Sequence, residues 1–338
     1  MVKAVPAGAA LMLAGCAPAA NTGGGRADAP AHAAAPGLRP GVHEVQINGV
    51  RLWYRVAGRA PAGVAPVVFL HGGPGQGSTH FDELAGDPME RSLAMVYLDQ
   101  RGSGRSERPP SGEYSIALLV EDLEELRQHL GVPRIGLIGH SFGALLALEY
   151  AKKYPANVSG IVFTSGLWDT PYQCRLRLQR VAELRPEAYA RVAADTLARD
   201  GTRRNDCELE FQAFRTREEK AAYDTEIMYP DPAIEVRMDS VNAAHGIRNT
   251  GELGRAIFQG GLLQYRFTAF DRITMPVLVI AGWHDGAARP AGLRELASRL
   301  PNARFVEYER SGHFPYLDEP ERFARETAAF FSATVAKR

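Results

Sequence analysis

The sequence predicts an α/β fold in which a mostly parallel sheet is flanked by helices. Short runs that are apolar throughout, rather than alternating with polar residues, indicate strands buried on both faces. Segments with a helical apolar stripe lie between these runs, and such alternation is typical of a parallel sheet with right-handed crossovers. The 338 residues, 45% of them hydrophobic, suffice for one large domain with a subdomain.

The expected strands follow in order along the chain. Residues 43–58 alternate in period 2 around Asn48-Gly49, a pair that favours a hairpin turn. Buried strands are expected at 66–70, 94–98, 134–139, 160–165, 276–282 and 303–309. A helix is expected over 115–131, where Gly131 provides a stop signal, and two more are expected over 288–300 and 319–336.

One long block interrupts this alternation. Residues 167–266 contain no convincing buried strand and are charged, aromatic and helix-prone. A block of this size between two sheet strands predicts a mainly helical insertion. The α/β core is therefore expected to comprise residues 41–166 and 267–338.

The first 40 residues differ in composition from the rest. Residues 1–15 carry Lys3 and then a short apolar run, the order typical of a signal peptide. The stretch "LAGC", which ends at Cys16, resembles the lipobox of bacterial lipoproteins and implies cleavage before Cys16 and lipidation of that cysteine. Residues 16–40, rich in Ala, Pro and Gly, predict a flexible tether. The alternative is a disordered Ala-rich start with an incidental cysteine.

These features predict an exported protein held by lipid at the periplasmic or cell-surface face of a bacterial membrane. No stretch reaches the roughly 20 apolar residues that span a bilayer, so the membrane contact is expected only through Cys16. The net charge of zero and the lack of a basic run argue against a nucleic-acid partner. In an oxidising compartment Cys174 and Cys207 either pair or stay separate thiols, and the sequence leaves both open, as it does the oligomeric state.

The segment Gly139-His140-Ser141-Phe142-Gly143 fits the pattern G-x-S-x-G. It follows an expected strand and opens a helical pattern, which is the context of a sharp turn that exposes a nucleophilic serine. Glycines beside the turn leave room for its strained backbone. We therefore predict that Ser141 is a nucleophile; a tight turn with a serine helix cap is the alternative.

An oxyanion formed by such a serine needs two backbone N–H donors. One is expected from Phe142, the residue after the nucleophile, and the other from the loop His71-Gly72-Gly73-Pro74-Gly75. Gly73 is the first choice for that second donor and Gly72 the alternative. His71 is expected to brace the loop.

The serine also needs a base, and the base needs an acid that orients it. In a fold with such a serine turn, both follow the nucleophile along the chain, the acid first and the histidine second. Asp285 follows the expected strand 276–282, and His313 follows the strand 303–309. We predict that His313 is the base and Asp285 the orienting acid. His284 is the nearest rival but precedes the acid.

Four motifs carry a family resemblance: "HGGPG" at 71–75, "DQRGSGRS" at 99–106, "GHSFG" at 139–143 and "SGHFPYLDEP" at 311–320. From residue 41 onward the chain resembles the α/β-hydrolase fold, and more narrowly the proline iminopeptidase (prolyl aminopeptidase) family of serine peptidases. The resemblance implies that the insertion is a helical cap. It also implies that Asp99 and Arg101 brace loops without a catalytic role.

The chain departs from that family at the elbow, in both residues that flank the serine. The family's elbow is usually Gly-Gly-Ser-Trp-Gly, whereas His140 and Phe142 here are closer to esterases and lyases of the fold. The family also holds the substrate's amino group with cap glutamates, and a cation in a closed pocket needs such a partner. Glu210 is our first candidate among the cap glutamates Glu208, Glu210, Glu218, Glu219 and Glu226.

The sequence thus predicts two-step acyl transfer without a metal or organic cofactor. The expected substrate is a short peptide with an N-terminal proline or a similar small residue. The alternative is a carboxylesterase or lactonase that acts on small esters with the same triad. A non-enzymatic surface lipoprotein with a decayed hydrolase domain is disfavoured because every triad residue is present.

Overall fold

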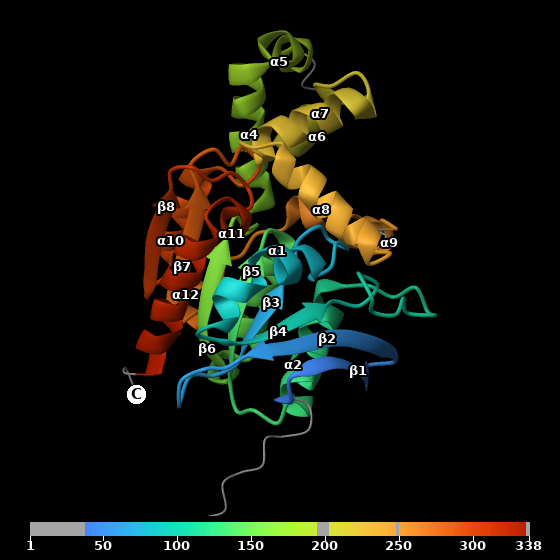
Figure 1. Ribbon diagram of the computed structural model, residues 1–338. Coiled ribbons are helices and arrows are strands. Elements are labelled where there is room, and N and C mark those ends of the chain that lie inside the picture. Colours follow the sequence, from blue (N-terminus) through green and yellow to red (C-terminus); the bar gives the residue numbers. More distant parts are fainter. Residues whose placement is uncertain (1–37, 195–202, 248–249, 336–338) are drawn as a thin grey trace, which may run out of the picture. The chain divides into compact units, whose positions relative to one another are not determined.

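A computed structural model describes residues 38–194, 203–247 and 250–335, all of them within one compact unit that spans Ala34–Arg338 (Figure 1). The predicted signal peptide, the lipidation site at Cys16 and the tether up to residue 37 lie outside the described residues. Among the helices that are described, none combines the length and apolar character needed to cross a membrane.

The described residues form an eight-stranded sheet with the order β1-β2-β4-β3-β5-β6-β7-β8. The first two pairings, β1 with β2 and β2 with β4, are antiparallel, and all others are parallel. This confirms the predicted fold class, including the hairpin, whose turn residues Asn48 and Gly49 both have positive φ. The strands are β1 (Gly41–Ile47), β2 (Val50–Gly58), β3 (Val67–Leu70), β4 (Ala94–Asp99), β5 (Ile135–His140), β6 (Val158–Thr164), β7 (Val277–Gly282) and β8 (Ala303–Tyr308).

Successive residues of a strand face opposite sides of the sheet, so strands that are apolar throughout give the sheet two apolar faces. Helices cover both of these faces. In β3, Val68 and Leu70 pack into one core with α2 and α3, while Val67 and Phe69 pack into a second core with α1 and α12. The helices of the α/β core, outside the insertion, are α1 (Thr79–Glu90), α2 (Ile116–His129), α3 (Phe142–Lys153), η2 (Pro155–Asn157), η4 (Phe270–Arg272), α10 (Pro290–Arg299), α11 (Pro315–Asp318) and α12 (Pro320–Val335).

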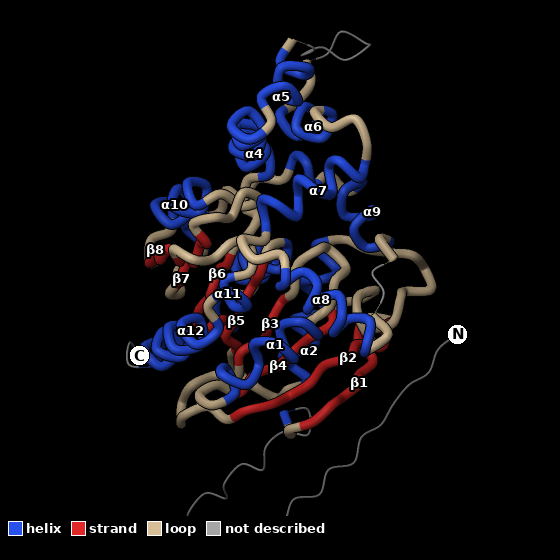
Figure 2. Tube along the Cα trace, turned by 45° about the horizontal axis from the view of Figure 1, so that its top comes forward, coloured by secondary structure: helices blue, strands red, loops and turns tan. Residues whose placement is uncertain are grey.

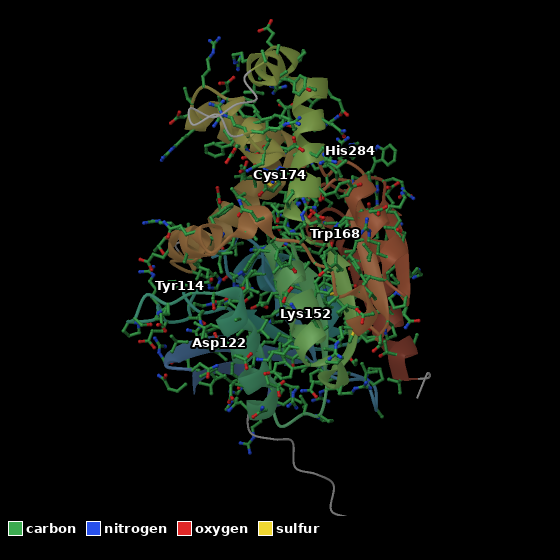
Figure 3. All side chains as sticks on the ribbon, turned by 180° about the vertical axis from the view of Figure 1, so that it is seen from behind. Tyr114, Asp122, Lys152, Trp168, Cys174 and His284 are labelled. Carbon is green, nitrogen blue, oxygen red and sulfur yellow. A yellow bond between two sulfur atoms is a disulfide. The ribbon has the colours of Figure 1, made fainter. Side chains whose placement is uncertain are left out.

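The insertion between β6 and β7 gathers as helices at one edge of the sheet (Figure 2). Its ends meet at the base: the N–H of Phe267 donates to the carbonyl of Trp168, and Asp169 forms a bridge and an ion pair with Arg266. Trp168, which is labelled in Figure 3, is buried, and its indole donates to the carbonyl of Gly292 in α10. The helices of this cap are α4 (Thr170–Leu184), α5 (Pro186–Ala193), α6 (Asp206–Gln212), α7 (Arg217–Met228), α8 (Ala233–Ala244), α9 (Glu252–Gln259) and η3 (Leu262–Gln264).

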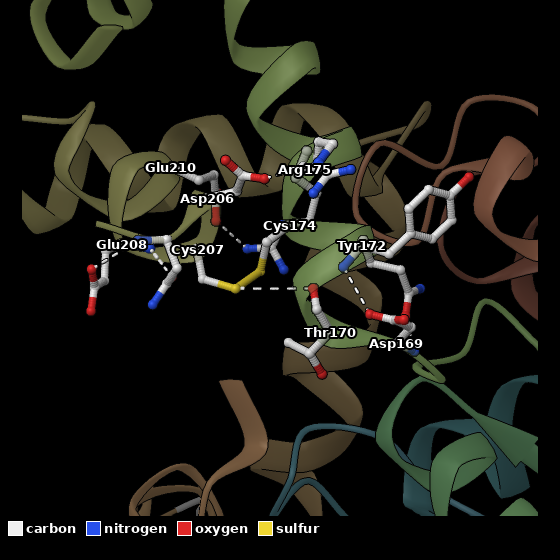
Figure 4. Close-up of a disulfide and its surroundings, with 12 residues drawn as sticks. Asp169, Thr170, Tyr172, Cys174, Arg175, Asp206, Cys207, Glu208 and Glu210 are labelled. Atoms are coloured by element: carbon white, nitrogen blue, oxygen red, sulfur yellow. Dashed lines mark hydrogen bonds and ion pairs between the residues drawn. A yellow bond between two sulfur atoms is a disulfide. The ribbon is translucent and has the colours of Figure 1, made fainter. Parts of the chain in front are cut away.

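A disulfide between Cys174 and Cys207 joins α4 to α6 (Figure 4). The two Cα atoms are 4.8 Å apart and both cysteines are buried. Of the two alternatives that the sequence leaves open, the structure has the paired one. The bond closes a loop with a sequence separation of 33 residues that lies wholly within the cap.

Candidate active site

Ser141 stands at the junction of β5 and α3 with φ 53° and ψ −117°, a backbone conformation that is strained for a residue with a side chain. The flanking glycines permit this turn. A Cβ on Gly143 would lie 2.0 Å from the carbonyl oxygen of Leu70, and a Cβ on Gly139 would lie 2.5 Å from the Cα of Ala144. Ser141 itself is partly exposed among buried neighbours. The local geometry is therefore that of a serine presented at the end of a strand.

His313 and Asp285 form a hydrogen-bonded pair in the loops after β8 and β7. The Nδ1 atom of His313 lies 3.0 and 3.1 Å from the two carboxylate oxygens of Asp285. The same carboxylate accepts the N–H groups of Ala287 and Ala288, each at 2.9 Å. Burial acts to raise the pKa of Asp285, but His313 and the hydrogen bond from Ala288 outweigh burial and lower it. With Nδ1 committed to an ionised acid, Nε2 of His313 is the atom left to exchange a proton.

The sheet brings this pair to the serine. The strands β3, β5, β6, β7 and β8 are parallel, so their carboxyl ends share one edge. The ring of His140, which precedes Ser141, lies 4.9 Å from the ring of His313, centroid to centroid. The loop that carries the predicted base therefore contacts His140, the residue next to the predicted nucleophile.

The glycine-rich loop after β3 reaches the same point. Leu70 pairs with Gly139 in the sheet register, and a Cβ on Gly72 would lie 3.0 Å from the Cβ of Ser141. Gly73 has φ 113°, a conformation available to glycine. Phe142 is the first residue of α3, so its N–H has no partner within that helix. The loop and the helix start therefore flank Ser141 as an oxyanion site requires, with Gly72 next to Ser141.

The buried His71 ties this loop to the end of β4. Its Nε2 accepts the N–H of Gln100 at 3.1 Å, and its Nδ1 lies 3.0 Å from the carbonyl of Gly72. The side-chain amide of Gln100 donates to the carbonyl of His71 at 3.0 Å. Burial lowers the pKa of His71, which keeps the ring neutral. This is the bracing contact that the sequence suggested.

Asp99 and Arg101 also lie among structural contacts. Asp99 accepts the N–H and hydroxyl of Ser78, each at 2.7 Å, and pairs with Arg105 at 2.7 Å. Arg101 donates twice to the buried Asp122 at 2.5 Å. Burial acts to raise the pKa of Asp99, but Arg105 outweighs it and lowers the pKa. Both side chains fix loops around the site.

The last turn of α7 in the cap contacts both loops of the acid–base pair. The carbonyl of Ile227 accepts the N–H of Gly286 at 2.7 Å, and the carbonyl of Met228 accepts the N–H of His313 at 2.9 Å. A Cβ on Gly312 would lie 2.3 Å from that Met228 oxygen. Sequence reasoning missed this contact, because backbone carbonyls at a helix end carry no residue signature.

A cavity of about 510 Å³ lies in the cap beside the elbow. Leu167 links the two, because its side chain lines the cavity and its N–H donates to the carbonyl of Ser141 at 3.3 Å. Most of the lining is apolar, and the exposed side chains of Phe211 and Phe258 line it as well. This volume is within the usual range for small-molecule sites.

Glu210 lies in the wall of this cavity and is 2% exposed. Its carboxylate pairs with Arg177 at 2.6 Å and with Lys220 at 3.2 Å, and Lys220 also pairs with Asp224. The four charges cancel. Within the described ranges, no group of three or more His, Cys, Asp or Glu side chains is arranged to hold a metal ion.

Residues 65–320 match the family model of the alpha/beta hydrolase fold, and the chain belongs to this family. A proline iminopeptidase from Lactiplantibacillus plantarum is 28% identical over 80% of this chain and 93% of its own length. One from Thermoplasma volcanium is 34% identical, but over 43% of this chain and 48% of its own length. The crystal structure of a proline iminopeptidase-related protein from Thermus thermophilus matches with a TM-score of 0.70 and 27% identity, covering 88% of this chain and 99% of that one.

The fold and these relatives define the protein's class: it is a serine hydrolase, similar to proline iminopeptidases over most of its length.

Proposed function

We propose that the protein releases an N-terminal proline, or a similar small residue, from short peptides by way of an acyl-enzyme. The observation that carries the mechanism is the pair His313–Asp285, held at 3.0 Å beside the strained turn of Ser141. The proline iminopeptidase relatives supply the choice of substrate.

In this mechanism Nε2 of His313 takes the hydroxyl proton as Oγ of Ser141 attacks the substrate carbonyl. The carbonyl π electrons move onto its oxygen, and the N–H groups of Phe142 and Gly73 stabilise that oxyanion. Asp285 keeps the ring of His313 in the right tautomer and stabilises its cationic form. His313 then protonates the leaving amine as the C–N bond breaks, and water, activated by the same ring, releases the acyl group.

Glu210 stays our candidate partner for the substrate's amino group. Its carboxylate lines the cavity next to the elbow. Because Arg177 and Lys220 already neutralise it, a bound ammonium has to displace Lys220, which then retains Asp224 as its partner. Binding of the substrate's amino group at Glu210 therefore requires Lys220 to move away from the Glu210 carboxylate.

The second candidate is a carboxylesterase or lactonase. Two observations favour it: the charges in the cavity cancel, and its walls are mostly apolar. A neutral ester fits such a cavity without the displacement of a lysine.

Turnover of proline-β-naphthylamide and of p-nitrophenyl acetate separates the two. We expect cleavage of both, lost in Ser141→Ala, with kcat/KM for the proline amide at least about tenfold lower in Glu210→Gln, which loses a buried charge partner. Glu187→Gln, which alters an exposed glutamate on α5, is the matched control and should change neither. Strong ester cleavage without amide cleavage would refute the peptidase assignment in favour of the esterase.

We further propose that the protein is exported and lipid-anchored at Cys16. The disulfide in the cap supports this proposal, because stable disulfides belong to oxidising compartments. Labelling of the expressed protein with a palmitate analogue should be seen in the wild type and lost in Cys16→Ala. Labelling that persists in the variant would overturn the proposal.

A further inference from the structure

His140 makes a direct hydrogen bond to the backbone of His313. Its Nε2 atom lies 2.8 Å from the carbonyl oxygen of His313. Because a carbonyl oxygen can only accept, Nε2 of His140 carries the proton, and its Nδ1 must be an acceptor if the ring is neutral. The two rings also meet edge to face.

This hydrogen bond continues into a chain of buried neutral groups. The hydroxyl of Tyr316 in α11 faces Nδ1 of His140 at 3.4 Å, and Nε2 of His80 in α1 lies 2.9 Å from the same hydroxyl. With Nε2 of His140 as a donor, the proton order is fixed: His80 donates to Tyr316, Tyr316 to His140, and His140 to the carbonyl of His313. Residues of α1, of α11 and of the loop after β8 thereby hold the ring of His140 in place.

The chain keeps its protonation state near neutral pH. His80, His140 and Tyr316 are at most 1% exposed. Burial lowers the pKa of His140 well below its usual value, lowers the pKa of His80 to about 3 and raises the pKa of Tyr316 well above its usual value. Because its members do not ionise near neutral pH, this hydrogen-bonded chain can hold the ring of His140 in one position without acting as a pH switch.

His313 is therefore held from three sides: its ring by Asp285, its N–H by Met228 of the cap and its carbonyl by His140. Of these three anchors, only His140 is joined to Ser141 by a peptide bond. A shift of about 1 Å between reacting groups costs on the order of 100-fold in rate.

We propose that His140 is a positioning residue, which ties the backbone of the nucleophile elbow to the backbone of the catalytic base and so sets their separation. This inference rests on the proposed roles of Ser141 and His313. It assigns no contact with substrate to His140, so its effect is expected in kcat and not in KM.

The test compares His140→Phe, which keeps the ring shape but loses the donor, with His140→Gln, whose Nε2 can still donate at the same reach. The readouts are kcat and KM on the better substrate and the rate of Ser141 labelling by a fluorophosphonate probe. We expect His140→Phe to lose 10- to 100-fold in kcat and in labelling rate with KM changed less than threefold, and His140→Gln to recover most of the loss.

His129→Phe is the matched control. His129 also bonds to a tyrosine hydroxyl, that of Tyr54 at 3.0 Å, but it lies on α2 away from the triad. Should His140→Phe fail to fold by circular dichroism, Tyr316→Phe takes its place, because it removes the hydroxyl that donates to Nδ1 of His140. A kcat loss of a few fold in that variant, absent in His129→Phe, supports the proposal.

Equal labelling of His140→Phe and the wild type would overturn the proposal. Equal impairment of His140→Phe and His140→Gln would overturn it too, because packing rather than the hydrogen bond would then explain the loss. Wild-type activity in Tyr316→Phe, where that variant is used, also counts against it. If Ser141→Ala is still labelled, the proposed nucleophile is wrong, and that outcome is separate from the other three.

Discussion

Loss of the disulfide is expected to destabilise the cap by a calculable amount. The bond between Cys174 and Cys207 closes a loop of 33 residues that holds α4 after its first turn, the whole of α5 and the start of α6. In the chain-entropy model, opening a loop of this length frees roughly 12 cal/mol/K in the unfolded chain, or about 4 kcal/mol at 25 °C. At about 2 °C per kcal/mol for a domain of this size, Tm should fall by roughly 8 °C.

Thermal and urea unfolding of the double variant Cys174→Ala/Cys207→Ala measures this change. Wild-type protein with and without reductant gives a second estimate that leaves the side chains unaltered, and reductant should not affect the double variant. Because both cysteines line the cavity, KM should rise along with the loss of cap stability. A drop in Tm of less than about 2 °C, in both comparisons, would contradict the reasoning, since it leaves under about 1 kcal/mol for the loop.

Three other changes test the site and the fold. Asp285→Asn should lower kcat by up to about 10⁴-fold in steady-state assays, because an amide holds the ring of the base in the wrong tautomer; a loss under tenfold would contradict its assigned role. Gly143→Ala should lower the free energy of unfolding in urea by about 3 kcal/mol or more, because its Cβ would lie 2.0 Å from the Leu70 carbonyl oxygen. Gly254→Ala on α9 is the control: the nearest atom to its Cβ would be 3.4 Å away, so the free energy of unfolding should rise by up to about 1 kcal/mol. The free energy of unfolding should fall as pH drops below 6.5, because the three buried histidines at positions 71, 80 and 140 have lowered pKa values and take up protons only on unfolding. Asp318, whose pKa burial raises to about 6, and Asp82, whose pKa burial also raises, oppose this in part, so the free energy of unfolding should still fall between pH 6.5 and 5; a flat profile over that range would contradict it.

The sheet could be predicted from the sequence because its strands are buried on both faces and therefore read as continuous apolar runs. The helix predicted over 115–131 is also present, as α2, and Ser115 caps it by accepting the N–H of Leu118. The predicted helix over 319–336 corresponds to α12, which is described from Pro320 to Val335. α1 was not predicted, since Gly86 and Pro88 within it obscure its pattern.

Spacing and strand order led to Ser141, Asp285 and His313, and the fold brings their loops together. The hydrogen bond of His140, by contrast, depends on a partner 173 residues away. No local pattern reveals such a contact. The same is true of Glu210, because its two cations come from α4 and α7, and a sequence does not show which helices of a cap pack together.

The carbonyls at the end of α7 bear on how this enzyme can be re-engineered. Exchange of whole caps between related hydrolases is an attractive route to new specificity if the cap is a separate module. Here the cap's Ile227 and Met228 accept hydrogen bonds from Gly286 and His313, so a transplanted cap has to bring a helix end of the same reach. A chimera whose cap lacks this helix end would leave the N–H of His313 without its acceptor. Such a chimera could fold and still lose its catalytic activity.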